Sequence, residues 1–151
     1  MSSSFIEYKG RGYWISDGFI GLVANYIKFN LNPLEHKEKW VIEFINSLSS
    51  ICSGNSIGWN SFHFDELLTS TERVYFVVTT IDKTISFVRS KGNFIPKDEL
   101  NSYESIKEKK FIALWSEDIE TKRILNLLLD IKLLIQEKGG FLHSDEIDYF
   151  W

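Results

Sequence analysis

The histidines and the cysteine are the residues through which this chain could carry out catalysis or bind a metal. The three histidines, His36, His63 and His143, lie 27 and 80 residues apart. None therefore stands at the spacing of three or four that places two ligands on one helix face. Cys52 is the only cysteine and lies in an apolar run, which is typical of a buried, unreactive thiol. The sequence therefore predicts no metal site.

The glycines and serines do not form a nucleotide-binding or hydrolase motif. Lys9-Gly10-Arg11-Gly12 contains a lone Gly-x-Gly, without the strand-loop-helix unit that cradles a phosphate. No Gly-x-Ser-x-Gly elbow, which would present a nucleophilic serine, occurs. We expect a protein that has no cofactor and is not an enzyme. One alternative stays open, because a small catalytic site can be assembled in space around His63 or His143.

Negative charge is concentrated in the last third of the chain. Residues 111–151 hold eight acidic and four basic residues, so their net charge equals the −4 of the whole chain. Several carboxylates stand beside aromatic residues, a pairing in which the acid steers a basic partner and the ring supplies contact area. The simpler interpretations are helix N-terminal charge and a solvated terminus. The candidate partner-binding residues are Asp65, Glu66, Glu117, Asp118, Glu120, Asp145, Glu146, Asp148 and Tyr149.

Charge and hydropathy argue against nucleic-acid and membrane partners. The isoelectric point is near 5.4, and Glu108 interrupts the densest basic run, residues 107–110. A chain of this charge is repelled by phosphates. No stretch reaches the roughly 18 apolar residues that a membrane span requires. Met1-Ser2-Ser3-Ser4 does not resemble the start of a signal peptide, so we expect a cytoplasmic protein.

Helical periodicity dominates the chain and predicts the elements that position these residues. Apolar residues recur at steps of three and four over 19–30, 40–51, 74–88 and 119–135. Residues 74–80 also have strong strand propensity, but the pattern runs to residue 88 without glycine or proline, which favours a helix. Ser116-Glu117-Asp118 looks like the start of the last helix, because serine and acids suit a first turn.

The N-terminus carries a hairpin signal, and the alternative is an irregular N-terminal arm packed on the body. Two short runs, Phe5-Ile6-Glu7-Tyr8 and Tyr13-Trp14-Ile15, flank Gly10 and Gly12, which predicts a hairpin. No linker or repeat divides the 151 residues. The expected fold is therefore all-α: one compact helical domain over 1–151, with at most a short hairpin at its N-terminus.

The opening from Phe5 to Gly18, together with the small size, acidity and aromatic content, resembles a known family. It is similar to the start of bacterial immunity proteins from contact-dependent growth inhibition and related polymorphic toxin systems. That resemblance implies a cytoplasmic protein that neutralises a toxin domain, commonly a nuclease, delivered by a neighbouring cell. It also implies that the acidic surface faces a basic toxin domain.

A third class of function remains beside the immunity protein and the enzyme. The chain has 23 aromatic residues, and an adaptor subunit of a permanent complex would expose several of them in one patch.

Overall fold

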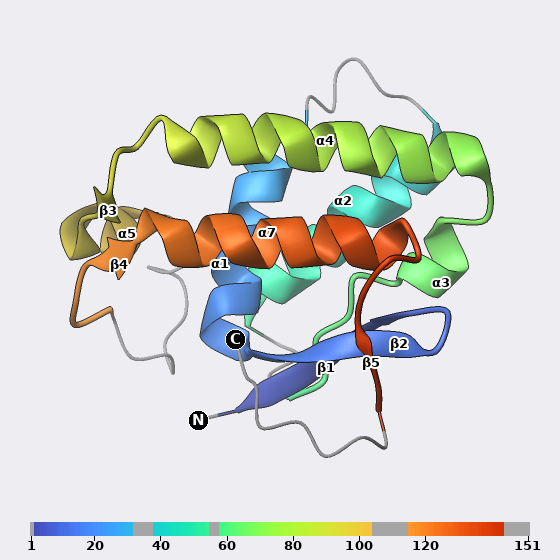
Figure 1. Cartoon of the computed structure of the whole chain (residues 1–151). Helices are drawn as coiled ribbons and strands as arrows, with labels where there is room; N and C mark the ends of the chain where they lie inside the picture. The colour runs from blue at the N-terminus through green and yellow to red at the C-terminus, as the bar shows by residue number, and fades with distance from the viewer. Residues whose placement is uncertain (1, 32–37, 55–57, 104–114, 144–151) are drawn as a thin grey trace.

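A computed structural model describes residues 2–31, 38–54, 58–103 and 115–143 of the chain. These residues form six helices and five strands (Figure 1). In chain order the elements are β1 (Ser3–Tyr8), β2 (Arg11–Ser16), α1 (Asp17–Phe29), α2 (Lys39–Ser53), α3 (Phe64–Leu67), α4 (Thr71–Arg89), β3 (Phe94–Ile95), α5 (Lys97–Ser102), β4 (Ile119–Glu120), α7 (Thr121–Ile135) and β5 (Phe141–Leu142).

The expectation of an all-α fold was wrong, because the helices are joined by two small antiparallel sheets. One sheet has the strand order β1-β2-β5, and the other pairs β3 with β4. Three of the five strands are only two residues long. Strands of that length leave no alternation in the sequence and are held by their partners, so periodicity missed them. The fold is mixed, with helices predominating.

The predicted N-terminal hairpin is confirmed. Ser3 to Tyr8 pairs with Ser16 to Arg11 in register, and Lys9 and Gly10 form the two-residue turn. Both turn residues have positive φ, 50° and 81°, which is the geometry that matches the right-handed twist of the two strands. Gly12 serves a different purpose, because a Cβ there would lie 2.1 Å from the carbonyl oxygen of Ile6.

The helices form the body that the sheet β1-β2-β5 covers on one side. α4 and α7 run antiparallel next to each other, while α1 and α2 pack together behind them (Figure 1). Residues 74–88 are helical within α4, as the uninterrupted pattern predicted. The apolar stripe of α7 is buried at Ile124, Leu127, Leu128, Ile131, Leu134 and Ile135. Lys132 on α7 bonds Asp82 on α4 across the pair at 2.7 Å.

The start of α7 differs from the expectation. The helix begins at Thr121, not at Ser116, because Ile119 and Glu120 pair with Ile95 and Phe94 as the strand β4. Ile119 is nevertheless buried, as the predicted apolar stripe over 119–135 required, although it lies on a strand and not on a helix. Among the residues described here, no helix combines the length and apolar character needed to cross a bilayer.

Candidate functional site

The predicted acidic residues that the structure describes fall into two groups at opposite ends of the molecule. Asp65 and Glu66 lie on α3, whereas Glu117, Asp118 and Glu120 lie at or just before β4 (Figure 1). They therefore do not form one surface. The candidates Asp145, Glu146, Asp148 and Tyr149, like His36 and the basic run 107–110, lie outside the described residues.

At the α3 end, the two acids are occupied by local contacts. Asp65 accepts a hydrogen bond from the backbone nitrogen of Lys9, at 2.8 Å, and so ties α3 to the hairpin turn. Glu66 Oε2 lies 3.8 Å from Nδ1 of His63, whose φ of 55° sets the N-terminus of α3. These contacts give Asp65 and His63 a structural role at this end.

At the other end, an exposed aromatic ring lies on the strand pair β3-β4, whose strands and flanking residues carry several carboxylates. Phe94 is 55% exposed on β3 and lies in register with Glu120 on β4. Glu117 and Glu120 are exposed, while Asp118 accepts the backbone N–H of Lys97 at 2.9 Å and fixes the start of α5. We call Phe94, Asp98, Glu117, Asp118 and Glu120 the acidic end. Lys97 and Lys122 also lie at this end, so its carboxylates outnumber its lysines but are partly neutralised by them.

The two histidines proposed as centres of a catalytic site are described and lie apart. His63 is at the N-terminus of α3, whereas His143 follows β5 and packs against the rings of Phe5 and Trp14, with centroids 4.8 and 5.4 Å away. Both side chains are exposed. Neither is among the described residues that line a cavity between α1, α2, α4 and α5.

That cavity, of about 920 Å³, is a feature that the sequence did not reveal. It opens between the C-terminal half of α1, the end of α2, the end of α4 and the end of α5. Its described lining residues are Asn25, Tyr26, Lys28, Phe29, Ser49, Cys52, Ser53, Phe87, Lys91, Ser102 and Tyr103. Cys52 is buried in its wall, in agreement with the expected buried thiol.

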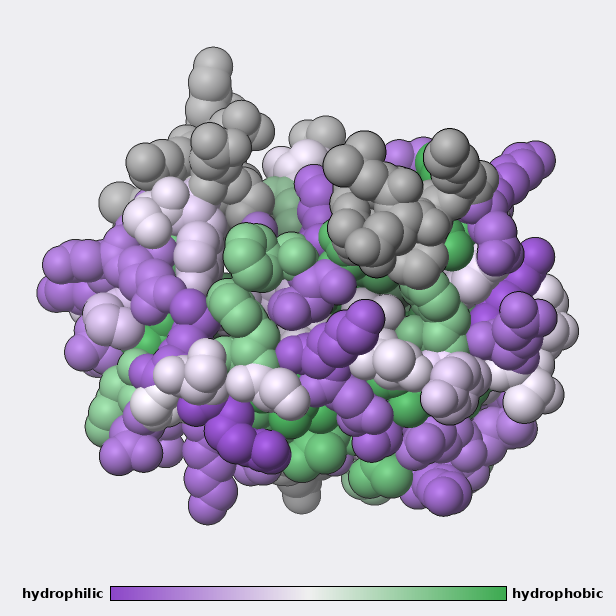
Figure 2. Space-filling view, turned by 90° about the horizontal axis from the view of Figure 1, so that it is seen from above, coloured by the Kyte–Doolittle hydropathy of each residue, from purple (hydrophilic) through white to green (hydrophobic). Residues whose placement is uncertain are grey.

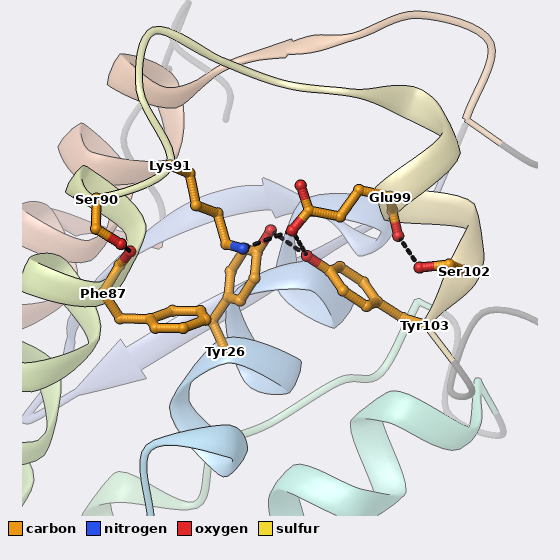
Figure 3. Close-up of polar contacts among 7 residues, drawn as sticks. All are labelled: Tyr26, Phe87, Ser90, Lys91, Glu99, Ser102 and Tyr103. Atoms are coloured by element: carbon orange, nitrogen blue, oxygen red, sulfur yellow. Dashed lines mark hydrogen bonds and ion pairs between the residues drawn. The ribbon is translucent and has the colours of Figure 1, made fainter.

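A chain of polar contacts crosses one side of the cavity (Figure 3). Lys91 Nζ bonds Glu99 Oε1 at 2.5 Å, and the side chains are 17% and 35% exposed. The hydroxyl of Tyr103 donates to the same oxygen at 3.3 Å. Tyr26 Oη lies 2.9 Å from Tyr103 Oη and is left as the donor of that bond. These four side chains thereby join α1 to the end of α4 and to α5, although Tyr26 and Tyr103 are 77 residues apart in the sequence.

The two tyrosines in this row of polar contacts, Tyr26 and Tyr103, are held in their neutral form. Burial, followed by donation to Tyr103, raises the pKa of Tyr26 well above its ordinary value of 10.0. Burial and the nearby charge of Glu99 also raise the pKa of Tyr103, against the opposing effect of the bond from Tyr26. A tyrosine whose pKa is raised is a poor base at neutral pH. The geometry therefore suits hydrogen bonding rather than proton abstraction.

The sequence contained a weak signal for this cluster. Tyr26 occupies an apolar position of the stripe over 19–30, and a buried tyrosine hydroxyl needs a partner. The partner of that hydroxyl depends on how α1, α4 and α5 pack together, and the apolar periodicity of a single helix does not predict this packing.

No family model, no curated protein and no solved structure matches this chain in the comparisons with known proteins.

Proposed function

We propose that this protein is a cytoplasmic immunity protein, which binds and neutralises a basic toxin domain of the nuclease type and performs no catalysis itself. The observation that supports this function is the acidic end, where exposed Phe94 stands in register with Glu120 and beside other carboxylates. An aromatic ring at the centre of an interface supplies binding energy, and carboxylates around it accelerate association with a cationic surface.

The chemistry of a nuclease explains why such a surface would inhibit it. Nucleases present lysine and arginine side chains to phosphate oxygens, and carboxylates pair with the same groups. Glu120 lies on the two-residue strand β4, which is anchored by its pairing with β3. Glu117 lies two residues before that strand, next to Asp118, which accepts the backbone N–H of Lys97. Their positions are therefore set before a partner arrives, which lowers the entropy lost on binding.

The alternative of an adaptor subunit has less support. The exposed aromatic residues of the described part of the chain come from α1, the segment between α2 and α3, α4, β3 and β5: Phe29, Trp59, Tyr75, Phe94 and Phe141. On the coloured part of the face seen in Figure 2, hydrophobic residues are interspersed with hydrophilic ones. A permanent interface normally draws its apolar residues into a larger continuous patch.

The deciding experiment pairs this protein with the gene product beside it. The C-terminal domain encoded by the adjacent upstream gene is expressed inside cells with and without this protein, and growth is recorded. We expect the domain to stop growth, this protein to restore it, and the two purified proteins to form a stable complex. A harmless domain, or toxicity that this protein does not relieve, would overturn the proposal.

A further inference from the structure

We propose that the cavity between α1, α2, α4 and α5 is a binding site for a small organic anion with a flat, apolar body. This site is separate from the acidic end and does not depend on the function proposed for that end. The argument rests on the size of the cavity, the charge of its lining and the rings at its mouth.

The cavity has the dimensions of a ligand site. Its volume of about 920 Å³ lies within the roughly 300–1,000 Å³ typical of small-molecule pockets. Such pockets combine apolar and aromatic walls with a few convergent polar groups. Here the lining residues Phe29 and Phe87 accompany Tyr26, Tyr103 and two lysines.

The charge of the lining favours an anion. Among the described lining residues, the two that are charged are Lys28 and Lys91, in a chain whose net charge is −4. Glu99 balances Lys91, whereas Lys28 forms no ion pair within the part of the chain that the structure describes. The protonated phenols add no negative charge. Counted over the described residues, one positive charge is therefore left at the cavity.

The rings favour a flat, apolar ligand. Phe29 is 69% exposed, and its ring centroid lies 5.0 Å from that of Phe87 at an interplanar angle of 35°. Lys91 Nζ lies 4.7 Å from the Phe87 centroid, so the ammonium group and the ring present themselves together (Figure 3). Covering Phe29 with an aromatic ligand would remove apolar area from water.

The test uses 8-anilinonaphthalene-1-sulfonate as the probe and neutral N-phenyl-1-naphthylamine as its uncharged counterpart. We expect the sulfonate to bind the folded protein saturably and to raise its melting temperature, since a ligand that prefers the folded state stabilises it. Lys28→Gln should weaken sulfonate binding about fivefold, the effect of one solvated charge pair, and leave the neutral dye unaffected. Phe29→Ala should weaken both dyes.

Lys39→Gln is the matched control, because Lys39 is 92% exposed and is not part of the cavity lining. Its variant should bind both dyes as the parent protein does. Absence of saturable sulfonate binding would overturn the site, and so would an equal loss in the Lys28 and Lys39 variants. Sulfonate binding that is unchanged in Lys28→Gln would overturn the preference for an anion. None of these measurements involves a toxin, so failure here is distinct from failure of the proposed function.

Discussion

Tyr26 on α1 and Tyr103 after α5 hold their hydroxyl oxygens 2.9 Å apart, although 77 residues separate them in the sequence. Through Glu99 and Lys91, this pair joins α1 to the end of α4 and to α5. The contact thus fixes one wall of the cavity, and its energy can be measured separately from any ligand.

A double-mutant cycle measures that energy. Tyr26→Phe and Tyr103→Phe should each lower the free energy of unfolding by about 1 kcal/mol, because each removes a hydrogen bond of a partly buried pair. In urea denaturation the double variant should lose about 0.5–1.5 kcal/mol less than the sum of the single losses. Tyr75→Phe is the control, since Tyr75 is exposed on α4. Strict additivity would mean that the two hydroxyls do not interact.

The same pair predicts the response to alkali. The pKa of Tyr26 is raised in the folded state, so the stability linked to its protonation is complete below the ordinary pKa of 10.0. That stability is lost as the pH rises above 10, because the unfolded chain then releases the proton and the folded chain retains it. Spectrophotometric titration should show one phenol fewer ionising together with unfolding in Tyr26→Phe. An unchanged titration curve would contradict the assignment.

Asp17 predicts the response to acid. Burial would raise the pKa of Asp17, but hydrogen bonds from Ser2, Ser4, Asn60 and the backbone of Gly58 outweigh burial and lower it. The folded pKa lies below the ordinary 3.8, so the linked stability is present above that pH and is lost as the pH falls through the folded value. Unfolding measured between pH 2 and pH 6 should show this loss.

Substitution of Asp17 gives a second test of the same site. Asp17→Asn should lower the free energy of unfolding by about 2–3 kcal/mol near neutral pH, because the new NH₂ group would face the N–H donors of Gly58 or Asn60. Its stability should also depend less steeply on pH in the acid range. Asp82→Asn removes a half-exposed carboxylate from its ion pair with Lys132 and should cost less than about 1 kcal/mol. Equal losses in the two variants would refute the importance of the Asp17 cluster.

The hairpin predicts different outcomes for its two glycines. Gly12→Ala should destabilise the protein by at least about 2 kcal/mol, because its Cβ would overlap the carbonyl of Ile6 on the paired strand. Gly10→Asn should cost no more than about 1 kcal/mol, since nothing lies within 4 Å of the added Cβ and asparagine accepts positive φ. Thermal unfolding distinguishes them, and a larger loss at Gly10 would contradict the register of the hairpin.

Charge reversal at each end of the molecule predicts which end meets a toxin. Glu117→Lys with Glu120→Lys should slow association on the order of tenfold at low salt and flatten its salt dependence. Glu66→Lys with Glu72→Lys makes the same change in net charge at the α3 end, where α4 begins. Stopped-flow measurements with the toxin domain compare the pairs. A stronger effect of the second pair would move the interface to α3.

The long helices α1, α2, α4 and α7 could be predicted from the sequence because each carries its own apolar period. The stripe over 74–88 outweighed a strong strand propensity, and α4 spans Thr71–Arg89. The short strands could not be predicted, because Ile119 and Phe141 gain their extended form from partners at Ile95 and Gly12. The same holds for the acidic residues: their types indicated partner binding, but only the positions of α3 and β4 show that the described ones lie at opposite ends of the molecule (Figure 1).

Because Arg11 on β2 pairs with Leu142 on β5, the sheet β1-β2-β5 can be completed only after nearly the whole chain has been synthesised. The guanidinium of Arg11 donates two hydrogen bonds to the carbonyl oxygen of Gly140, from Nε at 3.1 Å and from Nη2 at 2.9 Å, and the two residues are 129 positions apart. At roughly 5–20 residues per second, a ribosome needs on the order of ten seconds to make the intervening polypeptide. The hairpin is complete long before its third strand exists. During that interval the edge of β2 that will pair with β5 is unpaired and can pair with a strand of another chain. Pairing with β5 then covers this edge.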